Sequence, residues 1–462
     1  MIMPIEHPGE QRSNETRRVI ASREPVGLRT YTPTQLAIAR SAGSCHWTAD
    51  GRRLYDYTSG VLVANLGHNP TGWQRRFLHY LGWDGDPGNA PYFMAAPLTS
   101  YNAIAEVEAV AVTRLVANLQ SHPGGGRMEQ VLWAASGSEA IQKALWSALA
   151  VDPARQTIIA TRHGFHGKKG LAEAVTGSES DKNRDPRVRF LSFPKSECDD
   201  ISRRGEAFDV SPYRAELERI KNESDGIACL ITEPYLGGGG SFHPPKAYLQ
   251  ELQAFCRENG ILFILDEIQA NFGRTGHMFA FETYGLEPDI VVLGKGLGNG
   301  VPAACAVGSS RVFNALGYGE ASDTFSANPL CCAAVLATLD IFEGEDILGP
   351  ARRSSAIIED GLLALKALPF VRHVRGEAGG MVWGVEISDF GGMTAGEVAN
   401  ACVLAAYRGD GQGRAVHLMG PLAKCVIRIA PPLTITTAEA RDSVDALGEC
   451  LKTAVECRSA TL

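Results

Sequence analysis

The stretch LQELQAFCRENGILFILDE, residues 249–267, decides the fold of this 462-residue chain. Its first half carries apolar side chains at steps of three and four residues, the spacing of one helix face: Leu249, Leu252 and Cys256. Gly260 ends the predicted helix, because glycine accepts the left-handed conformation of a helix C-terminus. The apolar run 261–265 then predicts a buried strand that ends at Asp266.

A second strand, residues 290–293, ends in the same way at Gly294-Lys295. From about residue 100 to 330 short apolar strands alternate with amphipathic helices, a pattern typical of right-handed βαβ units. We therefore predict an α/β fold with a mainly parallel central sheet and helices on both faces. Ligands of such sheets gather at the carboxyl ends of the strands, where Asp266 and Lys295 are expected.

The flanking regions predict a second, smaller α+β domain. Asp50-Gly51 lies between two short strand-like runs and indicates a hairpin. We assign residues 1–75 to an N-terminal arm and hairpin that join the small domain, 76–335 to the large domain, and 336–462 to the small domain. The polar start, Met1–Arg18, lacks the apolar core of an export signal and predicts a loose arm.

Composition limits the class of partner. The formal net charge of −8 comes without a Lys/Arg block, which argues against nucleic acid as a partner. No apolar stretch approaches the ~20 residues of a membrane helix, so no membrane partner is expected. The eleven cysteines form no CxxC pair, so we expect free thiols, a cytoplasmic location and no metal site.

Two features suggest chemistry. Ser136-Gly137-Ser138 lies at a predicted strand-to-helix turn, where free N–H groups and the helix dipole favour a phosphate. Without a ligand, Ser136 is simply an N-cap. A buried lysine such as Lys295 can form a Schiff base, and a carboxylate such as Asp266 can hold a pyridinium proton; a structural ion pair is the alternative.

The order of several motifs along the chain is more specific. They are SGSEA at 136–140, GFHG at 164–167, TEP at 232–234, LDEIQ at 265–269 with FGRTG at 272–276, GKGLG at 294–298, TF at 324–325 with NPL at 328–330, and RIAPPL at 428–433. In this order they resemble the class III aminotransferases, which are pyridoxal phosphate (PLP) enzymes of fold type I. The resemblance extends from about residue 43, through Asn65-Leu66-Gly67-His68, to about residue 436.

The resemblance implies roles for the two strand-end residues. Lys295 matches the lysine that binds PLP as a Schiff base and then moves the proton between the substrate and the cofactor. Asp266 matches the carboxylate that keeps the pyridine nitrogen protonated.

Five further positions match cofactor-binding residues of the family. Gly137 and Ser138 match its phosphate cradle, Phe165 an aromatic side chain that stacks on the ring, and Gln269 a side chain near the ring hydroxyl. Thr324 matches a threonine that reaches the phosphate from the neighbouring subunit, which implies a homodimer with shared sites.

The substrate pocket departs from the family pattern. Arg428 matches the arginine that grips a substrate carboxylate, and Tyr92 and Phe93 are candidates for the pocket wall. Gly238 stands where many members carry a glutamate that pairs with this arginine. A glycine cannot act as that carboxylate switch, so Arg428 is either permanently available or swings aside for bulky substrates.

We therefore expect a ping-pong aminotransferase that cycles between PLP and pyridoxamine phosphate. An ω-amine or amino acid would donate the amino group, and a keto acid or aldehyde would accept it. A PLP-dependent aminomutase or a decarboxylating transaminase is the alternative within the same chemistry. A non-catalytic relative of the fold is the alternative from another class, and the presence of both Lys295 and Asp266 argues against it.

Overall fold

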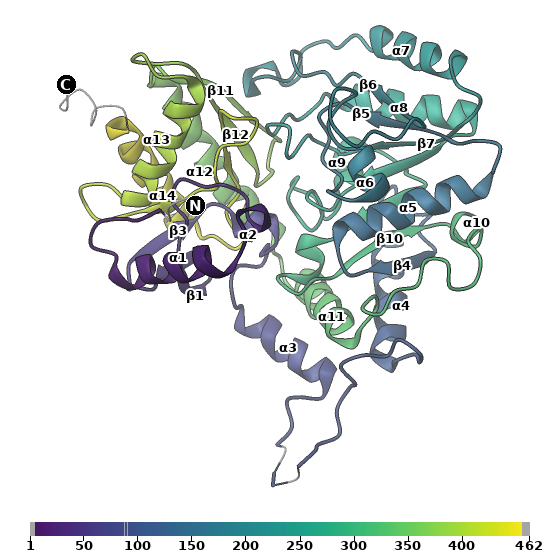
Figure 1. Ribbon diagram of the computed structural model, residues 1–462, viewed down its shortest axis with the longest axis horizontal. Helices are drawn as coiled ribbons and strands as arrows, with labels where there is room; N and C mark the ends of the chain where they lie inside the picture. Colours follow the sequence, from purple (N-terminus) through teal and green to yellow (C-terminus); the bar gives the residue numbers. More distant parts are fainter. Residues whose placement is uncertain (1–4, 87, 90, 455–462) are drawn as a thin grey trace. The chain divides into compact units, whose positions relative to one another are not determined.

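The computed structural model describes residues 5–86, 88–89 and 91–454 (Figure 1). They form two compact units, which are described separately. The larger unit is one continuous segment, residues 71–347, whereas the smaller combines residues 5–70 with 348–454.

The larger unit extends beyond the boundaries expected at 75/76 and 335/336, because it includes two complete helices at its ends. Helices α3 (Thr71–Leu81) and α11 (Pro329–Gly344) both belong to the larger unit. The indole Nε1 of Trp73 donates to Thr338 Oγ1 at 3.0 Å, and both side chains are buried. Because α11 is apolar nearly all round, it is stabilised by burial on several sides and lies in the core.

A seven-stranded sheet crosses the described part of the larger unit in the order β4-β10-β9-β8-β7-β5-β6. All its neighbouring strands run parallel except β10, which is antiparallel to both of its neighbours. In chain order the strands are β4 Gln130–Ala134, β5 Thr157–Thr161, β6 Val188–Leu191, β7 Ile227–Thr232, β8 Leu262–Asp266, β9 Ile290–Leu293 and β10 Ala304–Gly308.

Helices cover both faces of this sheet, as predicted. Ile264 of β8 packs in a cluster with α5 (Gly137–Val151), whereas Phe263 and Leu265 pack in another with α8 (Lys246–Asn259). Successive strand side chains point to opposite faces, so a strand apolar at every position is buried on both. The other helices of this unit are α4 Glu106–Ser121, α6 Gly170–Ala174, α7 Ser211–Asn222, α9 Ala280–Tyr284 and α10 Ser310–Phe313.

The smaller unit contains two sheets, ordered β1-β2-β3-β13 and β11-β12-β14. The predicted hairpin is present as β2 and β3, with Asp50-Gly51 between them. Strand β13 pairs in parallel with β3 and so joins the two chain segments that make this unit. Its elements are α1 Gln11–Arg23, β1 Ile38–Ala42, β2 Cys45–Thr48, β3 Arg53–Asp56, α2 Ser59–Leu62, α12 Leu348–Ala364, β11 Val371–Gly376, β12 Trp383–Ile387, α13 Ala395–Arg408, β13 Val416–His417, β14 Val426–Ile429 and α14 Thr437–Thr453.

The expectation of a loose N-terminal arm is wrong for most of its described length. Helix α1 is fixed by Arg17, whose buried guanidinium donates to Glu10 Oε2 at 2.8 Å and to Tyr407 Oη at 2.9 Å. These bonds tie a polar segment to α13, so apolar periodicity could not reveal the helix. Across the described ranges, every helix is too short or too polar to cross a lipid bilayer.

Candidate functional site

Three parallel strands end side by side in the larger unit. Thr232 of β7 pairs with Leu265 of β8, and Asp266 of β8 pairs with Val292 of β9. The residues that follow these strands therefore emerge at one edge of the sheet, where open α/β sheets bind ligands. This edge holds Glu233, Asp266 and the Gly294-Lys295 turn.

Asp266 is a buried carboxylate held by two donors. Its side-chain Oδ2 lies 2.7 Å from His166 Nδ1, and its Oδ1 accepts the Ile268 N–H at 3.0 Å. The His166 side chain is fully buried, and its Nε2 has no hydrogen-bond partner among the described residues. The pair fixes the direction of the carboxylate and provides a proton donor beside it.

His166 was not predicted as a site residue. The motif at 164–167 predicts that this loop lies at the site, but the residue predicted to contact the cofactor is Phe165 and not His166. The contact between His166 and Asp266 joins positions 100 residues apart, so it can be recognised only in the folded structure.

Glu233 lies next to this pair and is also buried. Its Oε1 accepts the Phe165 N–H at 2.9 Å, and its Oε2 accepts the Gly237 N–H at 3.2 Å. Burial raises the pKa of Glu233 to about 7, with His166 opposing the rise and the Asp266 charge adding to it. Glu233 thus fixes the backbone of the loop that carries Phe165, whose own side chain is 44% exposed.

Lys295 is held in an unusual backbone conformation. It begins the short 3₁₀ segment Lys295–Gly298 with a φ of +46°, in the left-handed region. A lysine adopts this region at a cost in free energy, and such strain is concentrated at functional sites. The half-buried side chain starts directly after β9, as the sequence predicted.

The N-terminus of α5 forms a narrow cradle. Ser136 caps the helix, with its Oγ accepting the Glu139 N–H at 3.3 Å. The backbone N–H groups of Gly137 and Ser138 are in the first turn, where no carbonyl oxygen of the same helix can accept them. A Cβ at Gly137 would lie 2.9 Å from Ile268 Cδ1, so a larger residue would require the Ile268 side chain to shift.

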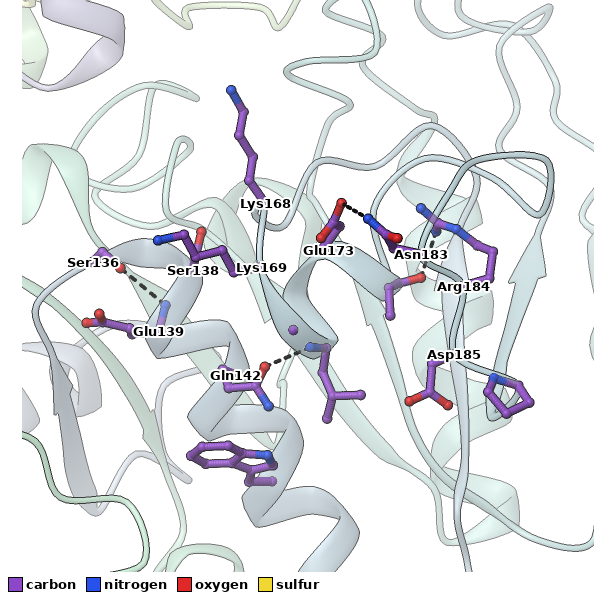
Figure 2. A pocket seen from close by; sticks show the side chains of 15 residues that line it. Ser136, Ser138, Glu139, Gln142, Lys168, Lys169, Glu173, Asn183, Arg184 and Asp185 are labelled. Carbon is purple, nitrogen blue, oxygen red and sulfur yellow. Dashed lines mark hydrogen bonds between the residues drawn. The ribbon is translucent and has the colours of Figure 1, made fainter. Parts of the chain in front are cut away.

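A groove of about 870 Å³ runs beside this helix end, lined in part by Ser138, Lys168 and Lys169 (Figure 2). Its floor is tied together by Gln142, whose Oε1 accepts the Leu171 N–H at 2.7 Å. The two lysines add positive charge near the positive end of the helix dipole, which favours an anion there.

Gln269 faces the glycine run 237–240. Its Oε1 is buried without a hydrogen-bond partner in the described part of the chain. A Cβ at Gly237 would lie 2.1 Å from this oxygen, and a Cβ at Gly238 would lie 3.1 Å from Phe165 Cβ. The run therefore lets the backbone approach both predicted cofactor residues closely.

The remaining predicted residues lie in other parts of the chain. Thr324 is exposed, and its segment is anchored by Asp323, whose Oδ2 pairs with the buried Lys143 Nζ at 2.6 Å. Tyr92 and Phe93 are exposed in the loop between α3 and α4. Arg428 is a buried residue of β14, in the smaller unit.

Comparisons with known proteins agree with this arrangement. A family model described as Aminotransferase class-III matches residues 92–451. Acetylornithine aminotransferase of Methanothermobacter thermautotrophicus is 29% identical, over 95% of this chain and 99% of its own. 4-Aminobutyrate aminotransferase of Mycobacterium leprae is 28% identical, over 92% of this chain and 93% of its own.

The fold is shared with solved structures. The ornithine aminotransferase of Toxoplasma gondii superimposes with a TM-score of 0.79, at 23% identity, covering 96% of each chain. The matched residues 92–451 include the whole of the sheet edge described above. This chain therefore belongs to the class III aminotransferases, transfers amino groups and uses PLP as its cofactor.

Proposed function

We propose that this enzyme takes the amino group from an ω-amine or amino acid and passes it to a keto acid or aldehyde in two half-reactions. The observation that carries the proposal is the sheet edge, where the Asp266–His166 pair and Lys295 follow neighbouring strands. The relatives reported above are all aminotransferases, so an aminomutase and a decarboxylating transaminase are not favoured.

The residues at this edge fit PLP. The first-turn N–H groups of α5 are open to a phosphate, and Gln269 offers a buried polar atom without a partner in the described part of the chain. The Asp266 carboxylate suits a protonated ring nitrogen. When bound, PLP supplies an aldehyde that condenses with amines and a ring that accepts electrons from the attached carbon.

Each side chain then has a defined task. Lys295 Nζ would hold the cofactor, and once released it would take up the proton from the donor's amine-bearing carbon. Asp266 would keep the ring nitrogen protonated, and His166 would orient Asp266. Phe165 would pack on the ring face, and Gly137 and Ser138 would bind the phosphate through N–H groups.

The donor class follows from the smaller unit and from the relatives. 4-Aminobutyrate, named in one relative, carries its amine at the end opposite its carboxylate. Arg428 is suited to bind such a carboxylate with its planar guanidinium. Because Gly238 offers no competing carboxylate, the enzyme would also accept uncharged amines, with pyruvate or 2-oxoglutarate in the second half-reaction; Tyr92 and Phe93 would line the pocket.

A homodimer is part of this proposal. Thr324 is exposed in one chain and would complete the phosphate site of the other. The free thiols of the described cysteines support a reducing, cytoplasmic setting, and neither nucleic acid nor membrane is proposed as a partner.

A half-reaction screen tests the proposal. Purified enzyme is mixed with ω-amino acids, α-amino acids and simple amines, and the visible absorption of the bound cofactor is followed. One donor class should remove the absorption within seconds to minutes, Lys295→Ala should abolish the change, and the exposed Lys182→Ala should not. Conversion by α-amino acids alone would contradict the ω-donor assignment.

A further inference from the structure

A cluster of three histidines and one aspartate lies inside the smaller unit. His46 and Asp56 come from the hairpin strands β2 and β3, His68 from the segment after α2, and His417 from β13. His46 and Asp56 are buried, and the His68 side chain is only 16% exposed. The cluster belongs to a different unit from Lys295 and has no part in the reaction proposed above.

One oxygen is shared by two histidines. Asp56 Oδ2 lies 2.7 Å from His68 Nε2 and 3.4 Å from His46 Nε2, and the three atoms lie within 4.8 Å of one another. The other oxygen, Oδ1, accepts from the Thr58 N–H and from Thr58 Oγ1, both at 2.7 Å. The carboxylate is therefore fixed, with its Oδ2 directed between the two imidazoles.

The outer contacts also suit a ligand role. Ser41 Oγ lies 2.7 Å from His46 Nδ1, so this nitrogen can carry the proton and leave Nε2 free to bind a cation. Metal-bound histidines nearly always have such a partner on the other ring nitrogen. The ring of His46 is thus already oriented toward Asp56.

His417 adds an independent observation. Its ring lies edge-on to that of His46, with centroids 5.6 Å apart, and its Nδ1 is buried without a hydrogen-bond partner among the described residues. Buried polar atoms are rarely left unsatisfied, and an ion is one common explanation.

We propose that His46, Asp56 and His68 bind a divalent transition-metal ion of the zinc type, with the fourth position open. Tetrahedral zinc with N and O ligands places them about 3.3 Å apart. The His46–Asp56 distance already matches this spacing, and the His68–Asp56 distance must lengthen by roughly 0.6 Å. The ion would join β2, β3 and the segment after α2, and thus stabilise the smaller unit.

The test measures metal binding to the PLP-loaded enzyme without an affinity tag. After chelation and dialysis, zinc is titrated by calorimetry, and cobalt is added separately because tetrahedral cobalt absorbs visible light. We expect one zinc per chain with sub-micromolar affinity, a cobalt spectrum of tetrahedral type, and a melting temperature raised by several degrees. The cofactor absorption is recorded throughout, because a metal bound at PLP would change it.

The variants locate the site. Asp56→Asn and His68→Ala should each weaken zinc binding at least about 100-fold, whereas His373→Ala in β11 of the same unit should leave it unchanged. Weak or substoichiometric zinc binding and an octahedral cobalt spectrum in the unaltered enzyme would overturn the proposal without any variant. Equal affinity in well-folded Asp56→Asn would do the same and would leave a hydrogen-bonded cluster as the correct description.

Discussion

The Asp266–His166 pair shows how a single residue derives its chemistry from its neighbours. The buried Asp266 carboxylate lies 2.7 Å from an imidazole nitrogen and accepts a backbone N–H at 3.0 Å, and these two contacts fix its direction. In the proposed function this carboxylate would keep a cofactor nitrogen protonated. The sequence predicted Asp266 for this role, but it did not predict the histidine that contacts it.

Asp266→Asn should lower the rate of the half-reaction at least about 10³-fold, because a neutral amide cannot hold the ring-nitrogen proton. His166→Asn should cost only about tenfold, since it removes orientation and not the charge. Single-turnover kinetics with a fixed donor measure both. The exposed His79→Asn serves as control, and an equal loss in both site variants would contradict this division of roles.

Glu233 gives the enzyme a stability that depends on pH. Its pKa rises from an ordinary value near 4.5 to about 7 on folding, so the folded chain holds the proton that the unfolded chain releases in this window. Its contribution is therefore complete below about pH 4.5 and is lost as the pH rises to about 7.

Glu233→Gln should remove this dependence. Urea unfolding at pH 5 and pH 8 measures the free energy of unfolding of both proteins. The value for the parent minus the value for the variant should be about 3 kcal/mol lower at pH 8 than at pH 5. A difference that stays constant across this range would mean that Glu233 is ionised throughout.

At the scale of the element, the start of α5 is a capped helix end and also the proposed phosphate cradle. Its cap and its first turn lie against the segment after β8, so the cradle and the Asp266 carboxylate share one wall, Ile268. The stretch at 136–149 predicted this helix because its apolar spacing is regular. The contact with Ile268 was not predictable, since it depends on how β8 and α5 pack.

Gly137→Ala should weaken PLP binding about tenfold. The new methyl group would lie 2.9 Å from Ile268 Cδ1 and displace that side chain, at a cost near 1.4 kcal/mol. Fluorescence titration of the apoenzyme with PLP measures the effect. Gly126→Ala has no neighbour within 4 Å of its new Cβ and should bind PLP as the parent does; matching affinities in the two variants would refute the cradle.

At the scale of the whole molecule, the sequence predicted the layered sheet better than the limits of its units. Alternating helices and strands between residues 100 and 330 are local patterns, and local spacing is enough to recognise them. The helical N-terminal segment is fixed by Arg17 and Tyr407, which are 390 positions apart. The histidine cluster likewise combines residues from four separate segments, so the spacing of residues along the sequence does not predict it.

The proposed homodimer also belongs to the scale of the whole molecule. The loop between α3 and α4 exposes Tyr92, Met94 and Ile104 at 90%, 99% and 92%, more than a stable surface ordinarily leaves to water. We expect sedimentation equilibrium to give twice the 49.5 kDa mass of one chain. Met94→Asp with Ile104→Asp should give single chains, and the control Leu363→Asp should not; a double variant that stays dimeric would place the interface elsewhere.

The parallel pairing of β3 with β13 has a consequence for synthesis. Tyr55 leaves the ribosome roughly 20 to 70 s before its partner Val416, at usual elongation rates. The larger unit, one uninterrupted segment, can fold within that interval, whereas the first 70 residues must wait for their partner strand. The exposed edge of β3 therefore stays without its partner strand until nearly the whole chain has been made.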